Sequence, residues 1–270
     1  MAESGNKAEI RKTKNFYSKL SKGIRNYNLL EDGDRILVGV SGGKDSMSLL
    51  SGLATRLRYR KENYTLVAVH IDVENVPYSI DRDYIQDFCD KHSIEFIIDT
   101  ITVDFSTDTN KSQCFLCSWN RRKRLFELSE KYNCNKIALG HHLDDAVETL
   151  LINMCYHASI SSMPASLKMF KGRIELIRPM ILLTNKEILD FAKIQGFPTE
   201  KETCPWDDKT KRNQAGEIIQ EMEKRFKPAR KSLFKSMSKI YTEYLPVEDG
   251  KNPIIDGLNV ASQKTNKGKS

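Results

Sequence analysis

The chain has 270 residues, a formal net charge of +7, and 39% hydrophobic against 29% charged residues. This length accommodates one or two domains with a full hydrophobic core. No apolar run approaches the roughly 20 residues that span a bilayer, and the N-terminus lacks the apolar region of a secretory signal. We therefore expect a cytoplasmic protein with no membrane association. In that reducing compartment the six cysteines are not expected to form a disulfide framework.

The basic charge is concentrated in three blocks. Residues 1–30, 111–136 and 201–240 each carry a formal net charge of +5, so the rest of the chain is acidic. Clustered basic charge favours a polyanionic partner. Solvated helix faces explain any single block equally well.

The N-terminal part, residues 1–33, predicts a basic helical arm. Between residues 9 and 30, apolar side chains recur near helical spacing, with lysines and arginines between them: Ile10, Phe16, Leu20, Ile24 and Tyr27. A turn at residues 31–34 is expected to end this helix. We expect the apolar stripe to pack on the body of the protein.

Strands and helices then alternate. Buried strands are predicted at 36–40, 64–72, 94–101 and 136–140, and helices at 47–60, 79–92, 116–132 and from 143 to about 156. This alternation is typical of an α/β fold with a doubly wound parallel sheet. Ligands of such sheets bind beyond the carboxyl ends of the strands.

The next segments contain no further predicted strand. Residues 159–180 show no regular period and are expected to be irregular. Thr184 and Glu187 form a capping box that begins a helix over 185–195, which Gly196 ends.

The predicted domain division places a central domain at 34–205, basic C-terminal helices at 206–246 and a tail at 247–270. The C-terminal helices are amphipathic over 214–244 and are expected to break at Pro228. The tail is rich in Lys, Asn, Gly and Ser, and we expect it to be disordered.

The most informative stretch is the loop after the first strand, Ser41-Gly42-Gly43-Lys44-Asp45-Ser46. A strand that leads through glycines into a helix N-terminus directs backbone N–H groups and the helix dipole at an anion. Lys44 adds a cation, and Asp45 can hold a metal ion. The spacing is that of neither a Walker A loop nor a dinucleotide-binding loop. It resembles the PP-loop of the N-type ATP pyrophosphatases, which split ATP into AMP and pyrophosphate. An ordinary Gly-rich turn is the alternative.

A second constellation follows the strand at 136–140. It reads Gly140-His141-His142-Leu143-Asp144-Asp145, with Glu148 three residues later on the same helix face as Asp145. These carboxylates can hold Mg²⁺ against ATP phosphates, although complementarity to the helix dipole also explains them. The adjacent histidines point to different sides, which argues against a zinc pair. The strand-end rule places residues 41–46, His70 and residues 140–145 on one rim.

Cys114-Phe115-Leu116-Cys117 is a CxxC followed by four basic residues at 121–124. Alone it fits half a metal site or a redox dithiol, and nearby positive charge favours thiolates. There is no second CxxC, so further ligands would have to be scattered cysteines. Cys204, in a polar loop, is the best candidate. The remaining cysteines are interpreted as structural: Cys89, Cys134 and Cys155.

Taken in order, these motifs resemble those of the TtcA/TtuA group of tRNA thiolation enzymes, and most closely the TtcA branch, the tRNA 2-thiocytidine synthetases. The similarity runs from about residue 19 to residue 245. Besides the three motifs above it includes residues 31–36, Met163-Pro164, Ile177-Arg178-Pro179 and the Cys204 loop.

The resemblance implies a [4Fe–4S] cluster held by Cys114, Cys117 and Cys204. The fourth iron would be open to sulfur supplied as sulfide or through a cysteine desulfurase. The resemblance also implies an ATP and Mg²⁺ site with these members: Ser41, Gly42, Gly43, Lys44, Asp45, Ser46, His70, Gly140 and Asp145.

The implied reaction is adenylation of the C2 carbonyl oxygen of a tRNA base, followed by replacement of that oxygen with sulfur. Asp45 and Asp145 are assigned as catalytic residues. Arg121, four positions after the second cysteine, is assigned to the activated base or the leaving phosphate. The expected partners are tRNA and a sulfur donor, and a homodimer is compatible with the sequence.

Two departures from the family pattern bear on the substrate. Many TtcA sequences have a second CxxC at the third-cysteine loop, whereas Asp207 stands at its second position here. The zinc-ribbon cysteine pairs of the thiouridine branch are absent, which favours cytidine over uridine. A PP-loop ligase would have no use for three cysteines. A non-enzymatic iron–sulfur or RNA-binding protein would not need Asp45 and Asp145.

Overall fold

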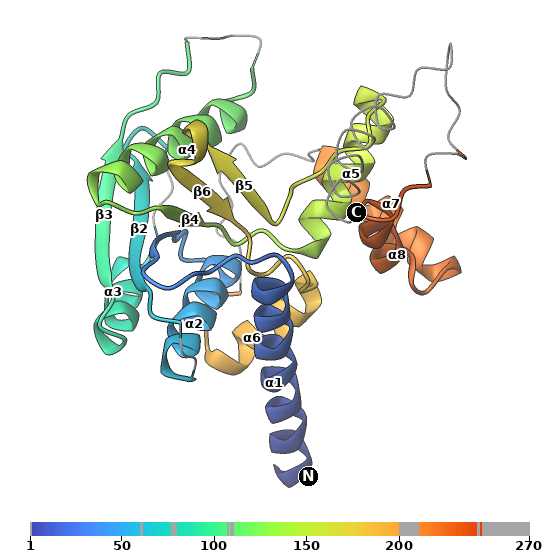
Figure 1. The fold of residues 1–270 in the computed structure, drawn as a ribbon, viewed down its shortest axis with the longest axis horizontal. Coiled ribbons are helices and arrows are strands. Elements are labelled where there is room, and N and C mark those ends of the chain that lie inside the picture. Colours follow the sequence, from blue (N-terminus) through green and yellow to red (C-terminus); the bar gives the residue numbers. More distant parts are fainter. Residues whose placement is uncertain are drawn as a thin grey trace, which may run out of the picture.

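The computed structural model describes residues 2–59, 62–76, 80–106, 108, 111–199, 211–241 and 244. The helices are α1 (Ala2–Asn26), α2 (Lys44–Tyr59), α3 (Arg82–Lys91), α4 (Gln113–Lys131), α5 (Leu143–His157), α6 (Asn185–Gln195), α7 (Lys211–Arg225) and α8 (Ala229–Ser236). The strands are β1 (Arg35–Gly39), β2 (Thr65–Val73), β3 (Glu95–Ile101), β4 (Lys136–Ala138), β5 (Ser166–Met169) and β6 (Ile174–Ile177). They form one sheet in the order β3-β2-β1-β4-β6-β5 (Figure 1).

The predicted doubly wound α/β sheet is confirmed. Neighbouring strands from β3 to β6 are parallel, and the order reverses between β1 and β4, where Val38 is level with Ala138. Helix α4 covers one face of the sheet, and α2, α3, α6 and α1 lie on the other (Figure 1).

The prediction for residues 159–180 was wrong. This segment contains β5 and β6, which pair antiparallel as a hairpin and add an antiparallel edge to the parallel sheet. Each strand has only four residues, and β5 is polar at Ser166 and Lys168. So short a pattern shows no recognisable period, and pairing with β4 rather than local sequence stabilises β6.

Successive side chains of β1 belong to two different hydrophobic cores, one on each face of the sheet. Ile36 and Val38 belong to the larger core with α1, α2, α3 and α6, whereas Leu37 packs in a second core with Leu128 of α4. Successive side chains of a strand point to opposite faces, so a strand covered by helices on both sides must be apolar throughout.

The N-terminal arm is a helix, as predicted. Only part of its apolar stripe packs on the body of the protein. Phe16, Leu20 and Ile24 are buried against α2 and α6, but Ile10 and Tyr27 remain exposed. The buried positions lie in the C-terminal half of α1, because the first turns extend beyond the sheet (Figure 1).

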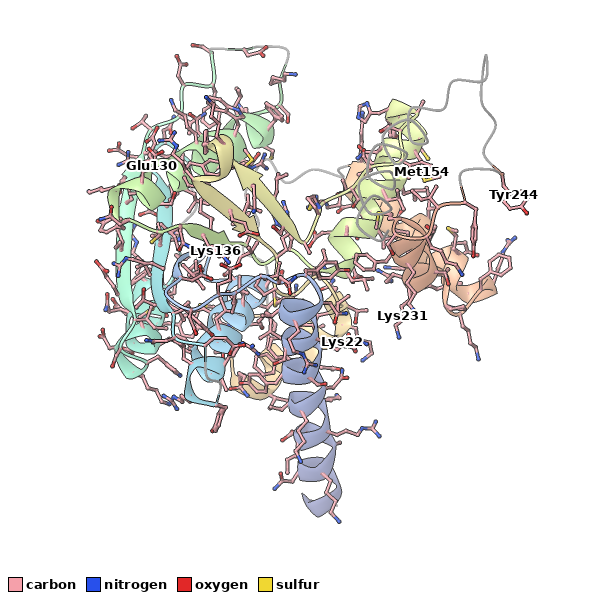
Figure 2. The ribbon with its side chains drawn as sticks, in the orientation of Figure 1. Lys22, Glu130, Lys136, Met154, Lys231 and Tyr244 are labelled. Carbon is pink, nitrogen blue, oxygen red and sulfur yellow. The ribbon has the colours of Figure 1, made fainter. Side chains whose placement is uncertain are left out.

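The C-terminal helices break where predicted, with Pro228 capping α8. Helices α7 and α8 pack on α5 through a small apolar cluster that includes Val147 and Ile219. Lys231 on α8 and Lys22 on α1 lie at the surface (Figure 2). The tail at 247–270 lies outside the described residues, and the predicted domain division stays a prediction.

Most other boundaries shift by only a few residues. Helices α2, α3 and α4 begin at Lys44, Arg82 and Gln113 rather than at 47, 79 and 116. The largest shift is at α8, which ends at Ser236 rather than at 244. The capping box of Thr184 and Glu187 and the end of α6 at Gly196 are confirmed. Among the described helices, none combines the length and the apolar composition required to cross a bilayer.

Candidate active site

A cavity of about 1000 Å³ lies at the carboxyl ends of β1 and β4, where the strand order reverses. Open α/β sheets bind ligands at this position. The cavity brings together most of the residues that the sequence predicts for the site: Ser41, Gly42, Gly43, Lys44, Asp45, Cys114, Cys117, Arg121 and Asp145. These residues span more than 100 positions of the sequence. They come together because the chain crosses from β3 through α4 to β4, which lies beside β1.

The loop after β1 is fixed by its own side chains. The hydroxyl of Ser46 accepts a hydrogen bond from the backbone N–H of Ser41 at 3.1 Å and donates one to the carbonyl of Gly43 at 3.0 Å. Gly42 has a positive φ of 79°. Lys44 Nζ lies 2.7 and 2.8 Å from the two carboxylate oxygens of Asp45, so both charges face the cavity as a pair.

Three predicted site residues do not line the cavity: Ser46, whose side chain is directed into the loop itself, and His70 and Gly140, which lie behind the loop. His70 is buried; its Nδ1 donates to the carbonyl of Val40 at 2.8 Å, and its Nε2 lies 3.1 Å from Asp72. A Cβ on Gly140 would lie 3.2 Å from the backbone carbon of Asp45. In this structure these residues hold the loop in place and do not line the cavity.

Cys114 and Cys117 occupy the first turns of α4 and line the cavity beside Arg121. Ser112 caps this helix by accepting from the backbone N–H of Phe115 at 3.2 Å. Two thiols three residues apart on one helix face fit two thiolate ligands of an iron–sulfur cluster. The predicted third ligand, Cys204, lies outside the described residues.

The remaining cysteines are placed elsewhere. Cys89 and Cys134 are buried, and burial raises the pKa of the Cys89 thiol to about 12 and that of Cys134 to about 11. Cys155 is exposed on α5, so the prediction that it is a structural packing residue was wrong. The buried residues of α5 end at Leu150, so Cys155 lies beyond the part of the helix that packs on the core.

The opposite wall of the cavity is acidic and is paired with a guanidinium from α7. Arg212 lies 3.3 Å from Asp145 and 3.8 Å from Glu148. Burial, with a contribution from the Asp145 charge, raises the pKa of Glu148 to about 7, whereas Arg212 lowers it. Carboxylates in this position fit Mg²⁺ carried on a nucleotide. Among the described residues, no three His, Cys, Asp or Glu side chains form a metal-binding group.

His142 is a lining residue that sequence reasoning did not assign to the site. Its ring lies 3.9 Å from Asp45 and 3.4 Å from Asp145, so it connects the loop to the acidic wall. His141 is half-buried, and burial lowers its pKa to about 4. Arg212 was also missed, because it is one of eleven basic residues in its block and only the packing of α7 on α5 distinguishes it.

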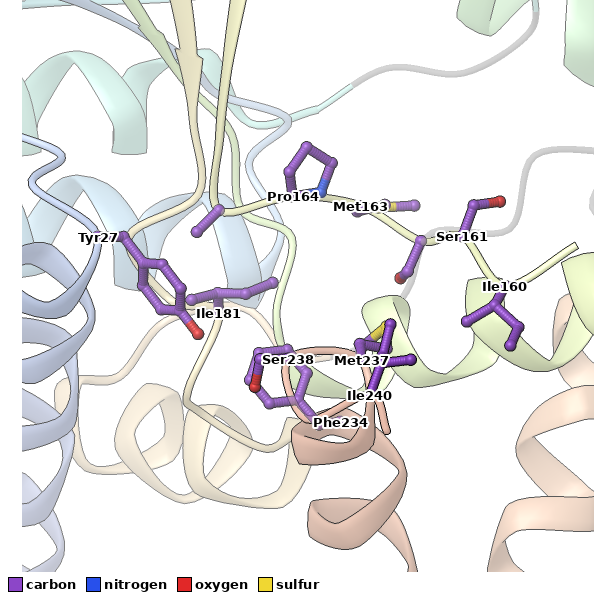
Figure 3. A pocket seen from close by; sticks show the side chains of 12 residues that line it. Tyr27, Ile160, Ser161, Met163, Pro164, Ile181, Phe234, Met237, Ser238 and Ile240 are labelled. Carbon is purple, nitrogen blue, oxygen red and sulfur yellow. The ribbon is translucent and has the colours of Figure 1, made fainter. Parts of the chain in front are cut away.

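A smaller hollow of about 290 Å³ lies between the loop at 160–165 and the end of α8 (Figure 3). Its lining is apolar or carries hydroxyl groups, with Tyr27, Ile181 and Phe234 among the larger side chains. It has neither cations for phosphate nor thiols for a cluster. The larger cavity is therefore the candidate active site.

Comparisons with known proteins agree with this geometry. The PP-loop domain family matches residues 9–222. A tRNA-cytidine(32) 2-sulfurtransferase from Pelobacter propionicus is 34% identical, over 84% of this chain and 86% of the relative. One from Delftia acidovorans is 30% identical, over 93% of this chain and 82% of the relative. The chain belongs to this PP-loop family. The resemblance found in the sequence motifs is thereby confirmed.

The fold of the family is also seen in a solved structure. The U34-tRNA thiolase NcsA from Methanococcus maripaludis, determined with its [4Fe–4S] cluster, superposes with a TM-score of 0.71. It is 22% identical in sequence and covers 88% of this chain, which covers 83% of it.

Proposed function

We propose that this protein is an ATP-dependent tRNA thiolase that converts a cytidine, at position 32 as in its named relatives, to 2-thiocytidine. One observation carries the proposal: a single cavity is lined by both the PP-loop and the CxxC of α4. A ligase that only adenylates needs the first set of residues. A protein that only holds a cluster needs the second.

The loop would bind the pyrophosphate part of ATP. Backbone N–H groups at the start of α2 and the helix dipole favour phosphate, and Lys44 adds a cation. Transfer of AMP to the C2 oxygen makes that oxygen a good leaving group, and the same donors stabilise the charge on departing pyrophosphate. Asp45 and Asp145 face the cavity with oxygen atoms suited to the Mg²⁺ that accompanies ATP.

Cys114 and Cys117, with Cys204 as the third ligand, would hold the [4Fe–4S] cluster. When bound, it supplies an iron atom at which a sulfur nucleophile can be held for attack on C2. Arg121 lies one helical turn beyond Cys117 and lines the same cavity, so its charge is available to the adenylate phosphate. AMP then leaves with the former C2 oxygen.

The target base must leave its stack to enter a cavity of this kind, which suits an RNA loop. The three basic blocks would contact phosphates and position the RNA without reading its sequence. We place the reaction in the cytoplasm, with a desulfurase or sulfide as sulfur donor; a homodimer remains compatible with the chain.

The test is thiolation of an unmodified tRNA transcript by anaerobically purified protein with ATP, Mg²⁺ and sulfide. Nucleoside mass spectrometry should detect 2-thiocytidine with wild type and with Cys155→Ser, whose thiol is exposed outside the cavity. Cys117→Ser should yield none and should also lose the brown colour and the iron of the wild type.

The other outcomes separate the alternatives. Release of AMP without a thionucleoside would support a ligase, and 2-thiouridine would assign the other base. Full thiolation by colourless protein would refute the cluster assignment. Full activity of Cys117→Ser would refute the role of the CxxC.

A further inference from the structure

Two large aromatic side chains of α4 are exposed next to the CxxC. Phe115 is 48% and Trp119 is 50% exposed. They are four residues apart and therefore lie on one face of the helix. Each ring has an ammonium group over it: Lys111 Nζ lies 5.2 Å from the Phe115 centroid, and Lys123 Nζ lies 5.9 Å from that of Trp119. We call this surface the aromatic face of α4.

The aromatic face and the cavity lining share the same turns of one helix. Phe115 lies between Cys114 and Cys117 in sequence, and Trp119 lies between Cys117 and Arg121. At 100° per residue the two sets of side chains point to different sides of α4, whose full diameter is about 10 Å. A nucleotide in the cavity and its neighbours outside could therefore contact opposite sides of the helix.

Charge on this face selects an anionic partner. Arg122 and Lys123 are exposed there, and Lys111 lies at the start of the helix. Among the acids of α4, Glu127 is already paired with Arg124 at 2.8 Å and lies 3.9 Å from Lys123. Exposed rings interleaved with cations match single-stranded nucleic acid, in which bases stack on aromatic side chains and phosphates meet lysine and arginine.

We propose that the aromatic face of α4 is a stacking platform for the unpaired bases that flank the modified nucleotide. Extruding one base from a loop removes the stacking of its neighbours, and Trp119 and Phe115 offer replacement partners beside the cavity. Lys111, Arg122 and Lys123 contact the adjoining phosphates. The inference rests on the proposed function and adds a specific RNA contact to it.

The experiment measures binding of a fluorescently labelled anticodon stem-loop RNA by anisotropy. Trp119→Ala should raise the dissociation constant about tenfold or more, since alanine substitution of a ring that stacks on a base weakens binding of single-stranded nucleic acid by about this factor. Trp119→Phe, which keeps a ring, should stay within about threefold of wild type. Tyr59→Ala is the matched control, because Tyr59 is 79% exposed beside Arg58 at the far end of α2; it should leave binding unchanged.

A second RNA, a duplex with the same stem sequence but no loop, distinguishes stacking on unpaired bases from contact with the phosphates. Wild type and Trp119→Ala should bind this stem equally and weakly. Unchanged affinity of Trp119→Ala for the stem-loop would overturn the platform, and so would an equal loss for both RNAs. Thiolation lost only with a protein sulfur donor, at normal RNA affinity, would assign the face to that donor instead.

The two proposals fail separately. If the stem-loop binds through Trp119 but no thionucleoside forms, the platform stands and the thiolation is refuted. If 2-thiocytidine forms while Trp119→Ala binds normally, the thiolation stands and the platform is refuted.

Discussion

Gly42 shows how a single backbone conformation shapes the phosphate loop. Its φ is +79°, and an added Cβ would lie 3.2 Å from Ile80 Cδ1. An L-residue pays about 1–2 kcal/mol in this conformation. Relief of that strain would turn the peptide N–H groups of the loop away from phosphate.

We therefore expect Gly42→Ala to weaken ATP binding by about tenfold, since 1.4 kcal/mol corresponds to that factor. Isothermal titration calorimetry would measure the ATP dissociation constants of the variant and of wild type. Gly172→Ala is the matched control: φ is +87°, nothing lies within 4 Å of its Cβ position, and it lies in the turn between β5 and β6, outside the cavity lining. It should lower stability without changing the ATP affinity. Equal effects on ATP binding in the two variants would contradict the argument.

The ion pair of Asp99 with Arg124 gives the stability of the fold a pH dependence. Arg124 donates to both carboxylate oxygens, at 2.7 and 2.9 Å, and these bonds hold the pKa of Asp99 below its usual value. A carboxyl group whose pKa is lower in the folded state stabilises at pH values above its unfolded pKa of about 3.9. That contribution is lost as the pH falls below this value.

Asp99→Asn should therefore lower the free energy of unfolding by about 1 kcal/mol at pH 7, the size expected for a partly exposed pair. The difference from wild type should shrink at pH 3. Urea unfolding of wild type and variant at pH 7 and pH 3 measures the difference in unfolding free energy at each pH. A difference that is the same at pH 7 and pH 3 would show that the charge of Asp99 is not responsible.

Sequence reasoning identified the loop, the CxxC and the acidic segment, because each has a local signature of residue type and spacing. The structure places His70 and Gly140 behind the loop rather than in the cavity lining, since a pattern shows the end of a strand but not which side of a loop a side chain contacts. Sequence reasoning missed Arg212, whose position depends on how α7 packs on α5.

Among the helices and strands, α6 has a local sequence signature, whereas the β5–β6 hairpin depends on contacts with a distant strand. Helix α6 has a cap at each end and a full apolar stripe, and its bounds followed from the sequence alone. The hairpin has two strands of four residues that depend on β4 for pairing, so nothing local specified them.

Helix α1 is attached to the body through its second half. Phe16 stacks on Phe191 of α6 with ring centroids 3.7 Å apart and planes 4° apart, and Lys19 pairs with Glu187 at 2.5 Å. This contact is continuous with the larger core. The helix is therefore part of the folded body over these turns.

Phe16→Ala should lower the free energy of unfolding by about 3–5 kcal/mol, as for other buried phenylalanines. Ile10→Ala, six residues earlier and 47% exposed, should change it by less than about 0.5 kcal/mol. Chemical denaturation of both variants tests the attachment. Similar small losses in the two would mean that α1 contributes little to the stability of the body.

At the scale of the whole molecule, the net charge of +7 is carried by separate blocks that include α1, α4 and the C-terminal helices. Such an arrangement attracts RNA over a wide surface and depends on counterion release. Raising the salt from 50 to 200 mM should weaken tRNA binding by at least about tenfold. The loss caused by Trp119→Ala should be similar at both salt concentrations, because stacking releases no counterions. Salt-independent tRNA binding would contradict this electrostatic account.

Within the described residues, β3 and β5 form the two edges of the sheet, and neither favours pairing with another strand. Strand β3 carries Glu95 and Asp99, which pair with Arg35 and Arg124, and β5 has only four residues and carries Lys168. Charged side chains and short edge strands oppose edge-to-edge pairing, the route by which sheets aggregate or merge between molecules. Pairing of these edge strands is therefore disfavoured as a route to a dimer, and concentrated protein should resist growth into fibrils.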